Sequence, residues 1–229
     1  MRERSLSSVP RAALALLLAA LAAQVAWHAL APGPAARSAA LAAAPSPALL
    51  RMAALGEPVA LSKLLMLYVQ AEDGSVPMDA ASLAGWLGRI ADLDPKAQYP
   101  LFAASHVYAE GGSEQRKRQM LEFVHTRFLA DPNRHWSAEA YIASAAKHQL
   151  HDLPLALRYA RALRQLGTGP QVPNWARQME VFVLEDMDEL ESAKVLLGGM
   201  LASGQLTDAN ERQFLSEHLK AMSKKAGRP

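Results

Sequence analysis

Cysteine is absent from the 229 residues of this chain. Its absence excludes disulfide bonds, thiolate metal ligands, a cysteine nucleophile and a lipid-modified N-terminal cysteine. The redox compartment stays open, because an oxidising environment tolerates a cysteine-free chain as well as a reducing one does. The length allows one domain of ordinary size or two small ones.

The short motifs of common catalytic sites are missing too. No Gly-x-Ser-x-Gly elbow is present, so nothing indicates an activated serine. The two glycine pairs do not form a phosphate-binding loop, because Gly111-Gly112 is typical of a turn and Gly198-Gly199 lies inside a helical pattern. We therefore expect no cofactor and no catalysis.

Clustered basic charge is absent from the body of the chain. The formal net charge is +2, but residues 1–37 hold four arginines against the single acid Glu3. The remainder carries 20 basic and 21 acidic residues. Because nucleic-acid binding requires clustered basic side chains, no nucleic-acid partner is expected.

Charged side chains are also missing from residues 12–31, a run of alanine and leucine with Trp27 near its end. Twenty helical residues span about 30 Å, the thickness of a bilayer core. Three arginines precede the run. The positive-inside rule then predicts a cytoplasmic N-terminus at 1–11, a single-pass transmembrane helix at 12–31 and a body on the periplasmic side of a bacterial inner membrane.

A cleaved signal peptide is the alternative for this segment. Ala29-Leu30-Ala31 fits the small-x-small cleavage pattern, but Pro32 follows it directly. The apolar run is also longer than the 7–15 residues usual for a signal core. We therefore predict a retained anchor. Residues 32–47, with prolines at 32, 34, 45 and 47, are interpreted as a linker to a domain at 48–229.

From residue 48 onward the apolar residues recur at intervals of three and four, without strand-like alternation. Examples are the predicted helix faces Leu61, Leu64, Leu65 and Tyr68, and Met120, Phe123, Val124 and Phe128. Glycine- and proline-rich turns separate these runs. The pattern predicts an all-α domain.

Prolines punctuate this domain at regular distances. Pro58, Pro95 and Pro132 are 37 residues apart, and Gly169-Pro170 follows 38 residues later. Each interval holds two helix-length patterns, which is typical of an α-solenoid. The predicted helical hairpins are 59–94, 96–131, 133–169 and 171–205, followed by a closing helix capped by Thr207 or Asp208 with Glu211 in its first turn.

The third and fourth hairpins resemble tetratricopeptide repeats. Tyr141 stands near the aromatic start of the first helix, and Ala156 and Ala193 are 37 residues apart at the small position of the second helix. The chain departs from the family pattern at two positions. Ala143-Ser144 stands where the family has Leu-Gly, and His151 or Asp188 stands where the family has a glycine in the turn. In layout the chain is similar to uncharacterised bacterial membrane-anchored proteins with such repeats. The resemblance implies a scaffold that binds a protein partner.

Basic side chains form the best local candidate for a ligand surface. Arg158, Arg161 and Arg164 recur every third residue on one predicted helix, and Arg177 follows in the next hairpin. They are a possible contact for a phosphate, a lipid headgroup or an acidic peptide. The alternative is a solvated helix face. The sequence assigns no catalytic, cofactor-binding or metal-binding residue.

His148, His151 and Asp152 form the set that most suggests chemistry, with His135 upstream. Two imidazoles and a carboxylate are zinc ligands, so a metal-assisted hydrolase of an envelope polymer is an alternative function. The predicted helix ends at about Leu150, which makes a polar turn the preferred interpretation. The aromatic residues at hairpin boundaries are expected to pack in the core: Tyr99, Trp136, Tyr141, Tyr159 and Trp175.

The sequence thus predicts a membrane-anchored helical-repeat scaffold, without catalysis, that binds a protein partner on the periplasmic side. A lipid- or anion-binding module built on the arginines is a further alternative. The sequence identifies neither the partner nor the oligomeric state.

Overall fold

A computed structural model describes residues 11–30, 43–73, 78–110, 112–204, 206 and 208–226. The chain forms two compact units, 1–39 and 40–229, and each is treated by itself. The predicted cytoplasmic N-terminus, most of the predicted linker and Thr207 lie outside the described residues. All regular structure within the described ranges is helical, as the sequence predicts.

The first unit contains helix α1, Arg11–Leu30, which matches the predicted helical segment at 12–31. Its large apolar side chains are exposed, for example Leu16 at 72 % and Trp27 at 73 %. The expected transmembrane helix is nevertheless not supported, because no single described helix is both long and apolar enough to cross a membrane. Among the described residues, 15–27 form a shorter apolar helical stretch.

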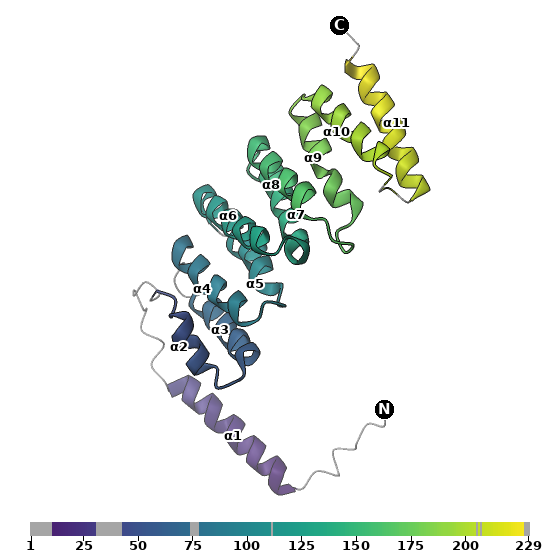
Figure 1. Ribbon diagram of the computed structural model, residues 1–229. Coiled ribbons are helices and arrows are strands. Elements are labelled where there is room, and N and C mark those ends of the chain that lie inside the picture. The colour runs from purple at the N-terminus through teal and green to yellow at the C-terminus, as the bar shows by residue number, and fades with distance from the viewer. Residues whose placement is uncertain are drawn as a thin grey trace. The chain divides into compact units, whose positions relative to one another are not determined.

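The second unit is a series of helical hairpins that pack in chain order (Figure 1). A short helix, α2 (Pro47–Ala53), precedes them. The first helices of the four hairpins are α3 (Pro58–Asp73), α5 (Tyr99–Phe102) continued by η2 (Ala103–Tyr108), α7 (Pro132–His148) and α9 (Asn174–Asp186). The second helices are α4 (Ala80–Leu93), α6 (Glu114–Ala130), α8 (Leu153–Leu166) and α10 (Leu190–Ala202), and α11 (Ala209–Ala226) follows.

These bounds agree with the four predicted hairpins and the closing helix. From α3 to α11 each helix contacts its neighbour in the chain, and α4 contacts α6 as α7 contacts α9. Such an arrangement is compatible with a helical-repeat solenoid. One buried apolar cluster extends from α3 to α9, and a second joins α9, α10 and α11.

The two Asp-Pro pairs have different roles. Asp131 caps α7, because its carboxylate accepts a hydrogen bond from the Arg134 amide at 3.2 Å, and Pro132 opens the helix where no amide hydrogen is needed. Asp94 instead ends α4, and Pro95 lies in the turn before α5. Both pairs separate hairpins, but only the second one starts a helix.

The buried faces of the helices are partly as predicted. Met120, Val124 and Phe128 of α6 are fully buried. In α3 the prediction is wrong, since Leu64 is 63 % and Tyr68 is 42 % exposed, while Ser62, Met66 and Val69 face the core. Apolar residues occur on both faces of α3, so their spacing alone did not select the buried one.

Two small residues allow the paired helices to approach closely. Ala156 of α8 and Ala193 of α10 have no exposed surface. At the preceding turns, His151 has φ +50° and Asp188 has φ +61°. Glycine adopts this left-handed conformation without penalty, which gives a physical reason for the glycine found there in tetratricopeptide repeats.

Asp188→Gly is therefore expected to maintain or raise the free energy of unfolding, whereas Asp188→Val should lower it by about 1–2 kcal/mol, because a branched side chain is strained at positive φ. Urea denaturation measures both changes. Glu189 is the matched control, since its φ of −83° should make valine at least as favourable as glycine. The same order of stabilities at both positions would contradict the strain argument.

Polar contacts join successive hairpins, and we call them junction contacts. They connect residues separated by 33 to 38 positions, about one repeat. Arg127 donates to Asp92 at 2.7 Å, and the Gln171 side-chain amide donates to the Asn133 carbonyl at 2.9 Å. Glu211 of α11 accepts from Asn174 of α9, which places α11 as a further first helix.

Candidate partner-binding surface

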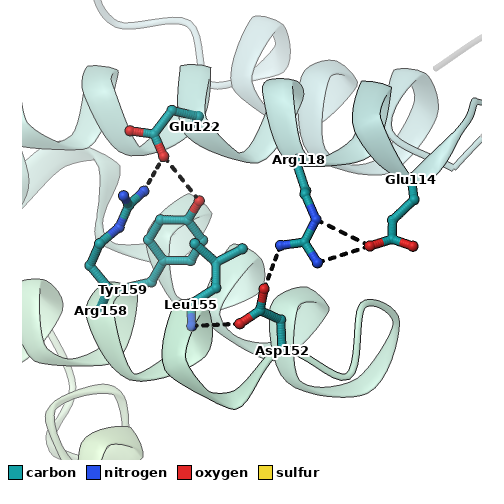
Figure 2. A network of polar contacts seen from close by, with 7 residues as sticks. All are labelled: Glu114, Arg118, Glu122, Asp152, Leu155, Arg158 and Tyr159. Carbon is teal, nitrogen blue, oxygen red and sulfur yellow. Dashed lines mark hydrogen bonds and ion pairs between the residues drawn. The ribbon is translucent and has the colours of Figure 1, made fainter.

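Three of the four predicted arginines lie on α8, and the first of them, Arg158, contacts other residues of the chain. Its guanidinium donates to Glu122 of α6 and lies 4.9 Å from the centre of the Tyr159 ring (Figure 2). The Tyr159 hydroxyl donates to the same Glu122 carboxylate at 3.3 Å. Both residues of the Arg158–Glu122 pair are about half exposed, so the pair contributes little stability.

Arg161 and Arg164 converge on one buried carboxylate. Their Nε atoms donate to the two oxygens of Glu180 on α9, at 2.9 and 2.6 Å. The Glu180 side chain is only 4 % exposed. Because a buried carboxylate without a partner is costly, these two arginines hold the third hairpin against the fourth.

Arg177 of α9 stabilises the turn before its own helix. Its Nε donates to the Gly167 carbonyl and its Nη2 to the Gly169 carbonyl, both at 2.9 Å. All four predicted arginines thus contact other residues of this chain. The prediction of an anion or partner contact at Arg158, Arg161, Arg164 and Arg177 remains a prediction, but their described contacts are structural.

His148, His151 and Asp152 lie around the turn between α7 and α8. The two histidines are exposed. The Asp152 carboxylate caps α8, accepting from the Leu155 amide at 3.0 Å, and it also accepts from Arg118 of α6 (Figure 2). The hydrogen bond from Arg118 lowers the pKa of Asp152. No group of three potential metal ligands occurs within the described ranges.

A buried acid–base pair lies deeper, between α6 and α7. The Nδ1 atom of His125 is 2.6 Å from Oε1 of Glu139, and Glu139 has no exposed surface. Its Oε2 atom has no hydrogen-bond partner among the described residues. Burial raises the pKa of Glu139 despite the hydrogen bond to His125. Burial likewise raises the pKa of Tyr159, whose ring lies 4.9 Å from that of His125.

The Glu139→Gln variant should become more stable, relative to the natural chain, as the pH rises above about 4.5. A carboxyl whose pKa is raised by folding binds its proton more tightly in the folded state, so its contribution to stability falls through the interval above its unfolded value of 4.5. Glutamine keeps the shape and cannot ionise. Chemical denaturation at pH 4.5, 6 and 7.5 measures the difference, and an equal difference at all three values would contradict the assignment.

The first helices of the four hairpins together form a surface that we call the first-helix row. Two hollows are described along it. The α3–α5 hollow has a volume of about 350 Å³. Met66, Ile90 and Pro100 supply much of its apolar lining, with Leu67 63 % exposed and Tyr99 45 % exposed at its margin. The Gln70 amide donates to the Tyr99 hydroxyl at 2.6 Å, which fixes one edge.

The second hollow, the η2–α7 hollow, measures about 280 Å³ and lies where η2 widens into a π-helix. The ring of His106 is stacked between Phe102, at 4.1 Å, and Tyr141, at 3.5 Å. Such widened turns often occur at functional sites, because they change the direction of side chains within a helix.

Ser105 and His106 in this turn are held by local hydrogen bonds. The Ser105 hydroxyl donates to the Leu101 carbonyl at 2.9 Å, so its hydrogen is already used. The Nδ1 atom of His106 is 2.9 Å from that hydroxyl and 3.2 Å from the Phe102 carbonyl. These contacts are all made within one turn of the same helix, and they hold both side chains in place.

The boundary aromatics are only partly core residues. Tyr159 is fully buried, as expected, but Tyr99 and Trp175 are about half exposed. Trp175 meets Trp136 at 5.8 Å in an edge contact. The prediction that these two rings pack in the core is therefore wrong. Both stand at the start of a first helix, and that position was the available sign of their exposure.

We compared the chain with protein-family models, with curated proteins and with solved structures. None of them matches it.

Proposed function

We propose that this chain is a helical-repeat scaffold of degenerate tetratricopeptide type that binds a segment of a partner protein along its first-helix row. The α3–α5 hollow carries the proposal. It combines an apolar lining with exposed Leu67 and Tyr99 at its margin. Large apolar and aromatic side chains around a concave site are typical anchors of protein recognition.

Several features support a scaffold. Consecutive hairpins form an extended row of first helices, and such rows suit a helix or an extended peptide. The four predicted arginines and Asp152 are engaged in contacts within the chain. The resemblance of the third and fourth hairpins to tetratricopeptide repeats points the same way.

The test places a photo-crosslinking amino acid at Leu67 in the full-length protein, expressed in its own cells. We expect a specific protein adduct, whose partner is then purified and titrated directly. Leu67→Asp and Tyr99→Ala should each weaken binding at least about tenfold. Val195, 76 % exposed on the second helix α10, is the matched control, and a crosslinker or aspartate there should have no effect. Equal labelling from both positions would contradict the proposed surface.

We also propose that residues 12–31 hold this scaffold at a bacterial inner membrane with its body on the periplasmic side. Their uncharged composition and the preceding arginines support it. Because the chain lacks cysteine, single cysteines at Ser7 and Ser223 give a clean test with a membrane-impermeant maleimide. Labelling at 223 alone in intact spheroplasts is expected. Labelling at neither position, or release of the protein by alkaline carbonate, would contradict the orientation or the anchor.

A further inference from the structure

The η2–α7 hollow contains a histidine whose ring makes no hydrogen bond to the described residues. His135 is 8 % exposed and lines the hollow from the first turn of α7. Its imidazole has no hydrogen-bond partner in the described part of the chain. The ring nitrogens are not among the buried side-chain atoms that lack a partner, so they are accessible at the wall of the hollow and can contact a ligand there.

The polar side chains of this hollow favour a negative group. Arg134, His135 and Ser137 line it from α7, and no acidic residue is part of its lining. Asp131 lies outside it and binds the Nε atom of Arg134 at 2.8 Å. The terminal nitrogens of Arg134 have no described partner, so they are available as donors.

Much of the remaining lining is apolar or aromatic. Leu101 and Phe102 come from α5, and Ala138 and Tyr141 come from α7. Phe102 is 46 % exposed, so part of its ring is open to another planar group. An inorganic anion would leave this wall without a contact, whereas an aromatic ring would cover it.

His106 belongs to the apolar wall rather than to the anion site. Its Nδ1 atom is already engaged by the Ser105 hydroxyl and the Phe102 carbonyl, and its ring is stacked between Phe102 and Tyr141. The negative group is therefore placed on the α7 side, at His135, Ser137 and Arg134.

We propose that the η2–α7 hollow binds a small aromatic monocarboxylate, with its ring against Phe102 and Leu101 and its carboxylate at His135, Ser137 and Arg134. A volume of about 280 Å³ suits one small molecule and is at the lower end of ligand pockets. This binding site is independent of the proposed protein partner, which is placed at the α3–α5 hollow.

Binding should strengthen as pH falls. Burial lowers the pKa of His135, so the ring is neutral at pH 7.5. Asp131 opposes that effect, while Arg127 of α6 and Arg134 add to it, and His106 faces the hollow from η2. A bound carboxylate favours the charged ring, so binding takes up a proton. The affinity should rise about threefold to tenfold between pH 7.5 and 5.5, where an ordinary carboxyl group is still ionised.

The experiment titrates the full-length protein with benzoate and follows the histidine ring signals by NMR. His135 and His106 should shift with one saturable dissociation constant. The exposed His148 and His151 serve as internal controls and should not move with it. Benzamide has the same ring without the charge, and inorganic phosphate has charge without a ring; both should bind at least about tenfold more weakly.

Two variants connect the signal to the hollow. Ala138→Met leaves the His135 residue unchanged but fills the space of the hollow, and it should abolish the His106 and His135 shifts. His135→Gln should remove the pH dependence while leaving the stacked His106 ring in place. His151→Asn is the matched control and should bind benzoate as the natural chain does.

Several outcomes would overturn the proposal. Equal binding of benzamide would make the hollow a neutral apolar site, and equal binding of phosphate would make the aromatic wall irrelevant. Unshifted His135 at saturating benzoate would end the proposal. If instead the purified protein partner shifts the His135 signal and benzoate does not, the hollow is part of the surface that binds the partner. Failure to find a protein partner at Leu67 leaves the benzoate result unaffected, so the two proposals fail separately.

Discussion

Replacing Arg161 and Arg164 together by alanine is expected to lower the free energy of unfolding by about 3–5 kcal/mol. The double change leaves the Glu180 carboxylate, 4 % exposed, without either of its charged partners. Removing both partners of a buried charge costs more than the pairs themselves contribute, because the remaining charge is neither solvated nor compensated. Urea denaturation followed by circular dichroism measures the loss.

Arg158→Ala is the matched control on the same helix. Its partner Glu122 is 52 % exposed, so water can replace the arginine, and the expected loss is about 1 kcal/mol or less. A triple variant that also carries Glu180→Leu should recover much of the stability, since no buried charge remains. If the double and control variants lose equal stability, Glu180 is not the reason for the arginines on α8.

The second large effect is expected from Ala156→Phe, which should destabilise the chain by about 3 kcal/mol. Ala156 has no exposed surface where α8 crosses α7, so a phenyl ring must push the two helices apart. Ala193→Phe should act in the same way on the fourth hairpin, because Ala193 is equally buried. Thermal unfolding measures both variants.

Ala221 on α11 is exposed and provides the control, where phenylalanine should change stability by less than about 0.5 kcal/mol. Unchanged unfolding of the Ala156 and Ala193 variants would mean that the hairpins are not closely packed at these positions. The interpretation of Ala156 and Ala193 as equivalent repeat positions would then be wrong.

Features with local causes were predictable from the sequence. Asp131-Pro132 starts a helix, Asp208 caps α11, and alanine at 156 and 193 permits close packing. Each depends on residues within a few positions of one another, so the spacing of prolines and alanines was sufficient to locate the hairpins. The buried state of Tyr159 was correct for a related reason, since its helix has apolar residues on one side only.

Features that depend on distant residues were not predictable. Glu180 lies 16 and 19 residues from the arginines it binds, and nothing in its own segment identifies it as buried. The arginines therefore looked like a free surface. The η2–α7 hollow requires Ser105 and His106 to meet α7 about 30 residues later, and the π-helical widening has no sequence signature that we recognised.

The junction contacts bear on the cooperativity of unfolding as well as on its midpoint. In a row of repeats each hairpin is coupled only to its neighbours, so the strength of each interface decides whether neighbouring hairpins unfold together. Arg127 and Asp92 couple the first two hairpins, whereas Asn133 and Gln171 couple the third to the fourth. Weakening one such interface would divide the single unfolding transition into two steps. The hairpins on either side of that interface would then unfold as two separate cooperative units.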